Sequence, residues 1–588
     1  MRTMMKRTAV AAALLAPLVA GALPAYTPVT DARLNKPEAQ NWLMYRANYA
    51  GWGYSPLKQV SDKNVDKLQL AWAFSTGMTE GHQAPPIVNN GYMFVATPNN
   101  QVICLEAKTG REIWRYKKTI PDELQQLHPT NRGVALYGDR VYIATTDAFL
   151  VALDAKTGKE VWKTAVADWK SGYYMTLAPL AAKGKIMIGS SGGEYGIRGF
   201  VAAFDADTGK EAWRTYTIAG PGEPGGDSWP GDTYKRGGGS VWITGTYDPD
   251  TNLAFWGVGN AGPWMADTRS GDNLYANSVL ALDVNTGKLK GYHQYHHNDS
   301  WDWDEVSAPL LIDLEHKGKK VKSLVHAGRN GYLWMLERTD SKVNYVDAWP
   351  YVTQNVFTQL DPKTGRPTYD PARIPATGKT VNFCPSLWGG KDWPPEAYNP
   401  HTGLLYIPAQ NNLCSELTGE PVKYNKGDLY LGVSIENVLT NVRMTPESKV
   451  HIGEVQAWDL KTGKGVDPHL PGNELGPADD HGRQSRVRWW HQRPQVPRLQ
   501  RQHRQAAVGI PDQLGRDRRA LQLRGRWRTV CRRAVRLGRR CRAHAGRVQR
   551  GARQEDHRAA GRRDLGVQAA QKVIRRGARS AERLPDKP

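Results

Sequence analysis

The chain repeats one short pattern, in which an acidic residue precedes a Thr-Gly pair and a tryptophan follows in the clearest copies. The copies CLEAKTGREIW, ALDAKTGKEVW and AFDADTGKEAW end at Trp114, Trp162 and Trp213, and weaker copies occupy 281–291, 359–369 and 457–467. The glycine supplies the positive φ that such a hairpin turn needs. A period near 50 residues, long enough for about four short strands, predicts an all-β propeller whose blades bury their faces against each other. We interpret the repeated tryptophan as a packing residue between blades.

One loop, HHNDSWDWDE at 296–305, alternates acidic residues with indoles. Asp302 and Asp304 are two residues apart, and in an extended segment both side chains point to the same side. Two carboxylates held together raise each other's pKa unless a cation lies between them, and oxygen ligands suit a hard cation. For an isolated pair of this kind a solvated acidic loop is the simpler explanation, so a metal site needs support from other parts of the chain.

The first 25 residues have the pattern of an export signal. Three basic residues precede the apolar run 9–22, which contains Pro17 and ends in the small-residue cleavage pattern Ala20-Gly21-Ala22. A membrane anchor is the alternative, but the run is short, and no later stretch is apolar for about 18 residues. We therefore expect residues 1–25 to be removed from a soluble, exported protein.

The formal net charge of +22 is concentrated at the end of the chain. From Arg483 onward there are 29 Arg and 2 Lys against 7 acidic residues, which leaves the first 482 residues close to neutral. A nucleic-acid-binding body would be basic itself. No nucleic-acid partner is therefore expected for it.

Two of the five cysteines suggest a disulfide. Cys384 and Cys414 bracket a loop rich in Pro, Gly and Trp and could pair in an oxidising compartment. Cys104 lies in an apolar run and is expected in the core, whereas Cys531 and Cys541 lie in the basic end. No CxxCH occurs, so the sequence gives no sign of a bound c-type haem.

The Thr-Gly-Lys repeats with tryptophan, together with WDWDE, resemble the quinoprotein alcohol dehydrogenases, which use pyrroloquinoline quinone (PQQ). The resemblance covers roughly residues 42 to 478 and begins with NWLMYRANYAGWGYSPLKQVSDKNV. It implies an eight-bladed propeller, here residues 26–478, with the cofactor and one metal ion in its channel.

The same resemblance implies a set of metal ligands, carried by SSGGEYGIRG, VGNAGPW and WDWDE: Glu194, Asn260, Asp302 and Asp304. Asp304 matches the extra carboxylate of the lanthanide-dependent branch of the family. Three carboxylates would overcharge a divalent site, so we favour a lanthanide over Ca²⁺.

The residues that would hold PQQ are implied in the same way: Gln83, Arg132, Thr145, Ser191, Gly192, Gly193, Ser240, Trp242 and Gln410. Trp242 would be the floor on which the flat quinone stacks. The glycines of SSGG would let a flat, anionic ligand approach the backbone, although on its own this segment reads as a tight turn.

Asp302 matches the family's catalytic base, and Arg329, in HAGRNG, matches the arginine beside the reactive quinone carbonyl. Without the family, Arg329 could equally be a surface arginine before an Asn-Gly turn. The resemblance implies that Asp302 takes the alcohol proton while hydride passes to the metal-bound quinone. Electrons would then leave for a soluble cytochrome c in the periplasm, and a homodimer is possible.

Several positions depart from the family pattern. Gln126-Leu127 stands in place of an adjacent cysteine pair, Gln83 in place of a glutamate, Gln410 in place of an asparagine and Ser240 in place of a threonine. These departures leave the substrate open, so a PQQ-dependent sugar or polyol dehydrogenase remains an alternative. A non-catalytic propeller that binds cell-envelope components is the rival of another class.

Residues 479–588 do not continue the repeat. They show no alternating pattern of strands and contain many arginines but almost no lysine. A composition of this kind does not suit a packed core. We expect a disordered tail produced by a shift of reading frame, with a basic nucleic-acid-binding tail as the alternative. A shifted frame would cost the propeller its last blades and leave strand edges exposed.

Overall fold

The computed structural model describes residues 25–79, 81–445, 452–466 and 487–488. The chain divides into two units, 1–506 and 507–588, and every described residue lies in the first. The expected export signal lies outside the described residues except for Ala25, and the basic tail except for 487–488, so both stay predictions. No helix of the described segments is long and apolar enough to cross a membrane.

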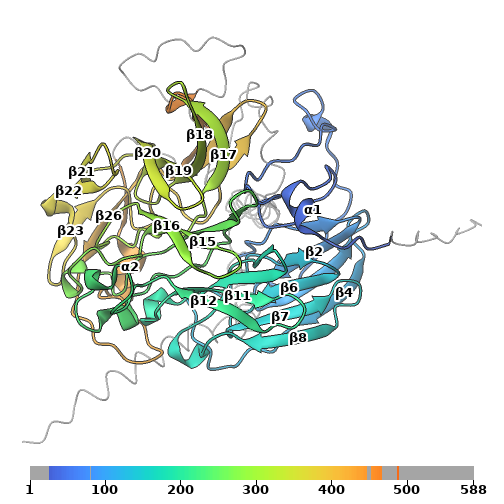
Figure 1. The fold of residues 1–588 in the computed structure, drawn as a ribbon, viewed down its shortest axis with the longest axis horizontal. Coiled ribbons are helices and arrows are strands. Elements are labelled where there is room, and N and C mark those ends of the chain that lie inside the picture. The colour runs from blue at the N-terminus through green and yellow to red at the C-terminus, as the bar shows by residue number, and fades with distance from the viewer. Residues whose placement is uncertain (1–24, 80, 446–451, 467–486, 489–588) are drawn as a thin grey trace, which may run out of the picture. The chain divides into compact units, whose positions relative to one another are not determined.

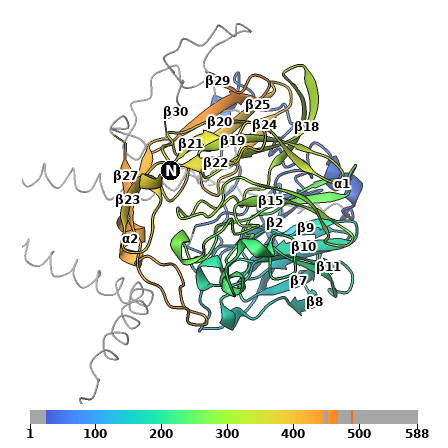
Figure 2. The same cartoon turned by 60° about the vertical axis from the view of Figure 1, so that its left-hand side comes forward.

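Five four-stranded antiparallel sheets follow one another along the described chain. The first two contain β1 (Ile87–Asn89), β2 (Tyr92–Thr97), β3 (Gln101–Glu106), β4 (Glu112–Lys117), β5 (Ala135–Tyr137), β6 (Arg140–Ala144), β7 (Phe149–Asp154) and β8 (Glu160–Ala165). The next two contain β9 (Leu180–Ala182), β10 (Lys185–Gly189), β11 (Phe200–Asp205), β12 (Glu211–Tyr216), β13 (Thr246–Asp248), β14 (Leu253–Gly257), β15 (Ser278–Asp283) and β16 (Leu289–Gln294). The fifth contains β17 (Leu310–His316), β18 (Lys319–Ala327), β19 (Tyr332–Arg338) and β20 (Val343–Pro350). In Figures 1 and 2 these sheets follow in colour order from blue to yellow-green, each beside the next.

The repeated motif joins the third and fourth strands of a sheet and docks it onto its neighbour. Trp213 on β12 donates its indole N–H to Val284 O at 2.9 Å. Its ring covers Gly287 so closely that a Cβ there would lie 2.5 Å from the indole. Trp114 covers Gly158 of the following sheet in the same way. The tryptophan-docking repeat of an all-β propeller is therefore confirmed.

The later strands interleave between sheets. β21 (Phe357–Leu360) and β22 (Pro367–Tyr369) form a hairpin, while β23 (Thr380–Phe383), β26 (Leu413–Thr418) and β27 (Val442–Met444) form a three-stranded sheet. The other sheet contains β24 (Ala397–Asn399), β25 (Leu404–Ala409), β28 (Glu454–Asp459) and β29 (Lys464–Val466), and β30 (Val487–Arg488) pairs with β28. Trp349 of β20 covers Gly463 of this sheet, so the docking continues here.

Helices are short and lie in connections. The α-helices of the described segments are α1 (Asp31–Asn35) and α2 (Ile435–Thr440). The 3₁₀ turns are η1 (Val65–Lys67), η2 (Trp169–Ser171), η3 (Gly193–Tyr195), η4 (Gly226–Ser228), η5 (Thr233–Arg236), η6 (Ala266–Thr268) and η7 (Pro371–Arg373). Of these, η3 carries a predicted metal ligand, Glu194.

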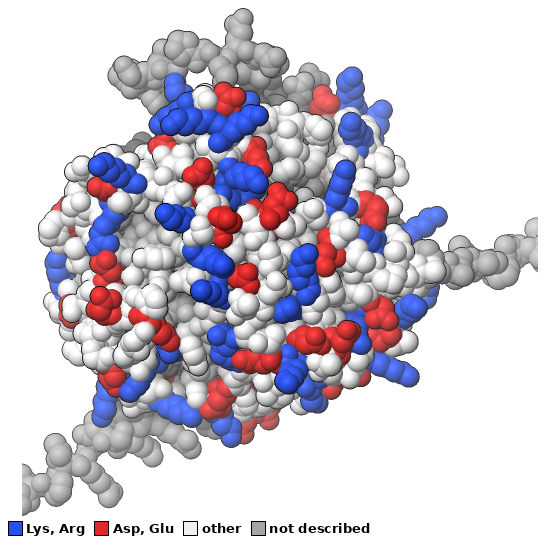
Figure 3. Space-filling model, viewed as in Figure 1, with Lys and Arg blue, Asp and Glu red and all other residues white. Residues whose placement is uncertain are grey.

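The middle strands are buried on both faces, as sheets packed between two neighbours require. Every residue of β14 is buried, and β11 and β15 are buried up to their last residue. Cys104, in β3, is fully buried, as expected, and forms no disulfide within the described residues. On the face shown in Figure 3, basic and acidic side chains are interspersed, in agreement with a nearly neutral body.

Candidate active site

The predicted site residues come from the ends of strands and the loops that follow them. Glu194 lies in η3 after β10, Asn260 follows β14, the acidic loop 296–305 follows β16, and Arg329 lies between β18 and β19. A propeller brings such strand ends of different sheets to one end of its channel. Residues far apart in the sequence can therefore meet there.

Arg329 lies against both residues of the acidic pair. Its Nη1 donates to Asp304 Oδ2 at 3.0 Å, and its Nη2 is 3.8 Å from Asp302 Oδ2. Nη2 also donates to Leu387 O at 2.8 Å. All three charged residues are buried. The sequence expectation that Asp302 and Asp304 face one point is met, and a guanidinium lies at that point.

Asp304 is held by donors from two further segments. Its Oδ1 accepts the backbone N–H of Asn260 at 2.9 Å, and its Oδ2 accepts the indole N–H of Trp242 at 3.2 Å. These bonds join the acidic loop to two other predicted site segments, 258–264 and 237–242. Asp304 is thus fixed in place by its surroundings.

The negative charges of the site's buried carboxylates are only partly balanced by positive charge, and burial raises their pKa values. Burial, together with the charge of Asp304, raises the pKa of Glu194 to about 7. Burial raises the pKa of Asp304 to about 6 and that of Asp302 well above its ordinary value, although Arg329 opposes both shifts. A further positive charge at this point would reverse these shifts.

Arg132, Thr176 and Ser191 form a group of polar contacts beside Trp242, here called the polar cradle. Arg132 Nη1 donates to the Thr176 hydroxyl at 2.8 Å, and that hydroxyl lies 3.1 Å from Ser191 Oγ. The guanidinium carbon of Arg132 lies 4.5 Å from the Trp242 ring centre.

The glycines of SSGG shape the same cradle. Gly192 has φ +106°, in the left-handed region that favours glycine. The N–H of Gly193 donates to Ser240 Oγ at 2.8 Å, so Ser240 contributes the same hydroxyl contact that a threonine would.

Three predicted cofactor contacts are not linked to this network through their side chains. The hydroxyl of Thr145 donates to Asp147 Oδ1 at 2.6 Å, within its own turn. Gln410 is linked to Arg329 through backbone bonds, since its N–H donates to Gly390 O at 2.6 Å and the N–H of Gly390 donates to Arg329 O at 2.8 Å. Gln83 and Gln410 each keep a buried side-chain oxygen without a hydrogen-bond partner in the described part of the chain.

The unpartnered polar atoms test whether the residues suit PQQ and a metal. Asn260 Oδ1 and Asp302 Oδ1 are buried without a hydrogen-bond partner among the described residues, as are Arg132 Nε and Arg329 Nε. Free oxygens beside buried carboxylates suit a hard cation, and free guanidinium N–H groups suit an anionic quinone. Within the described segments no three His, Cys, Asp or Glu side chains form a ready metal cluster, and at this site the guanidinium of Arg329 contacts both aspartates. The donor set fits both groups.

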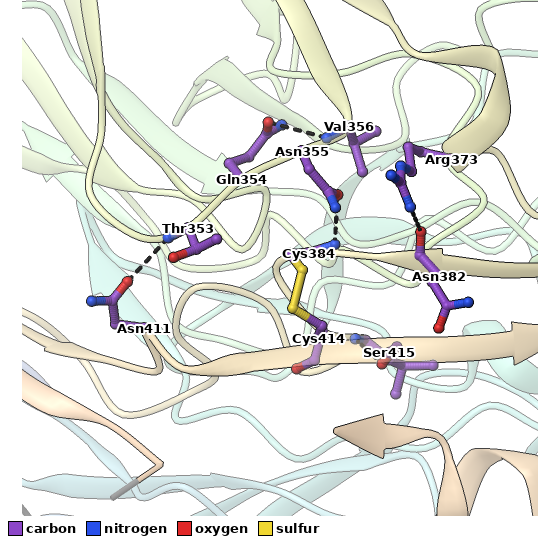
Figure 4. Close-up of a disulfide and its surroundings, with 12 residues drawn as sticks. Thr353, Gln354, Asn355, Val356, Arg373, Asn382, Cys384, Asn411, Cys414 and Ser415 are labelled. Atoms are coloured by element: carbon purple, nitrogen blue, oxygen red, sulfur yellow. Dashed lines mark hydrogen bonds between the residues drawn. A yellow bond between two sulfur atoms is a disulfide. The ribbon is translucent and has the colours of Figure 1, made fainter. Parts of the chain in front are cut away.

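A disulfide joins Cys384, which follows β23, to Cys414 in β26 (Figure 4). The cysteine pairing suggested by the sequence is therefore formed. The chain then leads from Cys384 to Ser386 and Leu387, whose carbonyls accept from Trp303 Nε1 at 2.9 Å and from Arg329. The disulfide thus anchors a segment that contacts the site.

Sequence reasoning missed at least two residues of this site. Thr176 bonds Arg132 but belongs to no recognisable motif. Asp392 is a further carboxylate near Arg329. Burial alone would lower the pKa of the Arg329 guanidinium, but the negative charges of Asp392 and Asp304 raise it above its ordinary value. The segment GGKDW around Asp392 has glycines before an indole, as GGGSVW does, and this likeness could have identified it.

Comparison with known proteins agrees with this geometry. The family model of the glucose, ethanol and alcohol dehydrogenase β-propeller domain with PQQ matches residues 42–343. Quinoprotein alcohol dehydrogenase PedH of Pseudomonas putida is 35% identical over 487 residues, which cover 78% of this chain and 80% of the relative. The chain belongs to the PQQ-dependent alcohol dehydrogenases.

Two lanthanide-related members of this family are also similar. A lanthanide-dependent methanol dehydrogenase of Methylacidiphilum fumariolicum is 36% identical over 425 residues, covering 68% of this chain and 69% of the relative. A solved europium-containing methanol dehydrogenase superposes with a TM-score of 0.69 at 35% identity, covering 74% of this chain and 79% of that chain. The enzyme class and the PQQ cofactor expected from the motifs are confirmed.

Proposed function

We propose that this chain oxidises a primary alcohol to the aldehyde, with PQQ as hydride acceptor and a lanthanide ion beside it. The observation that carries the proposal is the convergence of Asp302, Asp304 and Arg329 beside Trp242. When bound, PQQ supplies a quinone carbonyl that accepts hydride, and the metal ion makes that carbonyl more electrophilic. The other steps belong to the chain's own residues.

Asp302 acts as the base. Its Oδ1, which has no hydrogen-bond partner among the described residues, can accept the hydroxyl proton of the alcohol, and its Oδ2 faces Arg329 at 3.8 Å. Loss of this proton from the oxygen allows the C=O bond of the aldehyde to form as a hydride leaves the carbon that carries that oxygen. Proton and hydride together account for the two hydrogens that the alcohol loses.

Arg329 and Trp242 orient the reactants. Arg329 holds a buried cation beside the two aspartates, where it would stabilise negative charge on an acceptor bound there. The Trp242 ring is held between the guanidinium of Arg132 and Asp304 Oδ2, and so offers a fixed surface for a flat ring. Arg132 would bind a carboxylate of the cofactor, whereas Glu194 and Asn260 would complete the metal site with the aspartates.

Reconstitution tests this function. The purified full chain is loaded with PQQ and either Ca²⁺ or La³⁺, and ethanol, a sugar and a polyol are offered with an artificial electron acceptor. We expect aldehyde from ethanol, with the faster rate in La³⁺. Oxidation of the sugar or polyol alone would favour the alternative substrate class, and failure to take up PQQ would favour the non-catalytic binding module.

The wider setting is part of the same proposal. Export to the periplasm is supported by the basic and apolar N-terminal segment and by the Cys384–Cys414 disulfide. With no CxxCH in the chain, a soluble cytochrome c would take the electrons. Cell fractionation, cytochrome reduction and light scattering test the compartment, the acceptor and a homodimer.

An eight-bladed ring is proposed on the docking pattern. Five four-stranded sheets, the sheet of β24, β25, β28 and β29, and the three-stranded sheet of β23, β26 and β27 account for seven blades. Before β1, Trp72 covers Gly110 and donates to Ala107 O at 3.2 Å, as the outer strand of a further blade would. Resequencing the gene across codons 470–490 would show whether a base change restores the repeat in the tail.

A further inference from the structure

A third carboxylate of the acidic loop is bound by the backbone that carries Arg329. Glu305 is fully buried. Its Oε2 accepts the N–H of Arg329 at 3.1 Å, and its Oε1 accepts the N–H of Asn330 at 3.1 Å. His326 Nε2 lies 2.6 Å from the same Oε2. Both oxygens are therefore engaged by one short segment.

The turn at 328–331 lets the carboxylate of Glu305 come close to its backbone. The N–H of Gly331 donates to Gly328 O at 3.1 Å and closes a turn around Arg329 and Asn330. A Cβ at Gly328 would lie 2.8 Å from Asn330 Oδ1 and 3.0 Å from Glu305 Oε2, so a larger residue would crowd both side chains. Charge-assisted bonds from two successive N–H groups are directional as well as strong.

The acidic loop is fixed at its other end by a similar arrangement. Asp299 is also fully buried, and its Oδ2 accepts the N–H of Asp302 at 3.1 Å. Its Oδ1 accepts the N–H of Trp303 at 3.3 Å. These bonds support Asp302 at φ +60°, a conformation that a non-glycine residue rarely adopts without such support.

We propose that Glu305 is a positioning residue, which ties the loop of Asp302 and Asp304 to the turn of Arg329 and so sets the distance between base and guanidinium. The inference rests on the proposed function and adds a residue that touches neither substrate nor cofactor. Because Glu305 is one residue from Asp304 and holds the N–H of Arg329, it links both partners of the 3.0 Å ion pair.

The substitution Glu305→Gln tests this link. The amide keeps the size of the side chain but replaces one acceptor oxygen with an NH₂ group, which cannot accept from a backbone N–H. His326 can adjust by changing its tautomer, whereas the N–H of Arg329 or of Asn330 loses its acceptor.

The first readout is amide hydrogen exchange of the full chain without added cofactor. We expect peptides covering 328–331 to exchange at least about tenfold faster in Glu305→Gln than in the wild type. The matched control is Asp248→Asn, since Asp248 is a buried carboxylate of β13 that pairs with Arg338 at 2.8 Å. It should speed exchange around its own pair and leave 328–331 unchanged. Unchanged exchange of 328–331 in Glu305→Gln would overturn the proposal.

The second readout compares the proteins loaded with PQQ and metal. We expect kcat of Glu305→Gln to fall about 10- to 100-fold, with KM nearly unchanged and a larger isotope effect from deuterated alcohol. A merely structural Glu305 would lower the yield of folded protein but leave kcat per bound PQQ and the isotope effect at wild-type values, which also overturns the proposal. A wild-type chain that neither binds PQQ nor oxidises alcohol refutes the proposed function, while the exchange experiment still decides whether Glu305 fixes the turn.

Discussion

The repeated turns and the candidate site use the same residue types in opposite ways. In the turn after β11, Asp205 Oδ1 accepts the N–H of Asp207, the N–H of Thr208 and the hydroxyl of Thr208 at 3.1, 2.9 and 2.8 Å. In the site, Asp302 is deeply buried and one of its oxygens has no hydrogen-bond partner within the described segments. The hydrogen bonds of the Thr208 side chain and backbone lower the pKa of Asp205, whereas burial raises that of Asp302.

The tryptophans show the same contrast. Trp213 packs on a glycine and donates to a carbonyl of the next sheet, so all its bonds serve the fold. Trp242 instead contacts two charged groups, the guanidinium of Arg132 and the carboxylate of Asp304. The comparison shows that residues whose polar groups are hydrogen-bonded within the blades stabilise the propeller. Residues whose buried polar atoms have no hydrogen-bond partner in the described part of the chain form the candidate site. Substitutions in the two regions should therefore affect different measurements.

The largest effect is expected for Asp302→Asn. The amide has nearly the same shape but cannot take the alcohol proton, so kcat should fall by about 10²- to 10⁴-fold. Single-turnover oxidation of ethanol by the PQQ- and metal-loaded protein measures this step. The thermal unfolding midpoint should stay close to that of the wild type. A variant that keeps more than about a tenth of the wild-type rate would exclude Asp302 as the base.

In the blades, Trp213→Ala should act on stability instead. Removing a buried indole costs about 3–5 kcal/mol of unfolding free energy, measured by chemical denaturation. Trp213→Phe is the matched control: it keeps a ring on Gly287 but loses the N–H bond to Val284 O, so its cost should be smaller. Protein that remains folded should keep the wild-type KM. A changed KM in folded Trp213→Ala would break the separation between the two regions.

The sequence predicts the repeated turns well and the contacts of the candidate site only in part. The docking of Trp114, Trp162 and Trp213 was predictable because each repeat carries its own turn and its own packing residue. Asp302 and Asp304 meet as expected, but not through the extended backbone on which the expectation rested: Asp302 has φ +60°, and the N–H of Asp304 donates to Asp302 O at 3.1 Å. The contact of Arg132 with Thr176 did not, because it joins segments 44 residues apart with no motif at Thr176. The Glu305–Arg329 contact likewise depends on how two loops meet in space.

A smaller effect is expected from the disulfide. It closes a segment of 30 residues beside the site. Replacing both cysteines with serine should lower the unfolding free energy by about 2–4 kcal/mol, chiefly by freeing the unfolded chain. Denaturation of wild type and variant, each with and without reductant, measures this contribution. The wild type under reducing conditions should match the variant, and an unfolding midpoint that reductant does not change would contradict the prediction.

The smallest effect concerns the turn aspartate. Asp205→Ala removes an acceptor of three hydrogen bonds at a half-exposed turn, so the loss should be about 1 kcal/mol at neutral pH. The Thr208 hydroxyl holds the pKa of Asp205 below its ordinary value, so the folded state favours the charged form. The contribution of this charge is therefore complete above the ordinary pKa of an aspartate, about 3.9, and is lost as the pH falls through the lowered value.

Denaturation at neutral pH and at successively lower pH compares wild type, Asp205→Ala and Asp205→Asn. The difference between wild type and Asp205→Asn, which keeps an acceptor oxygen but has no charge, should vanish as the pH falls. Asp205→Ala should remain less stable than Asp205→Asn throughout, because it lacks the acceptor. If the difference between wild type and Asp205→Asn instead stayed constant with pH, this turn carboxylate would contribute through shape alone, and the contrast with the charged residues of the site would be sharper still.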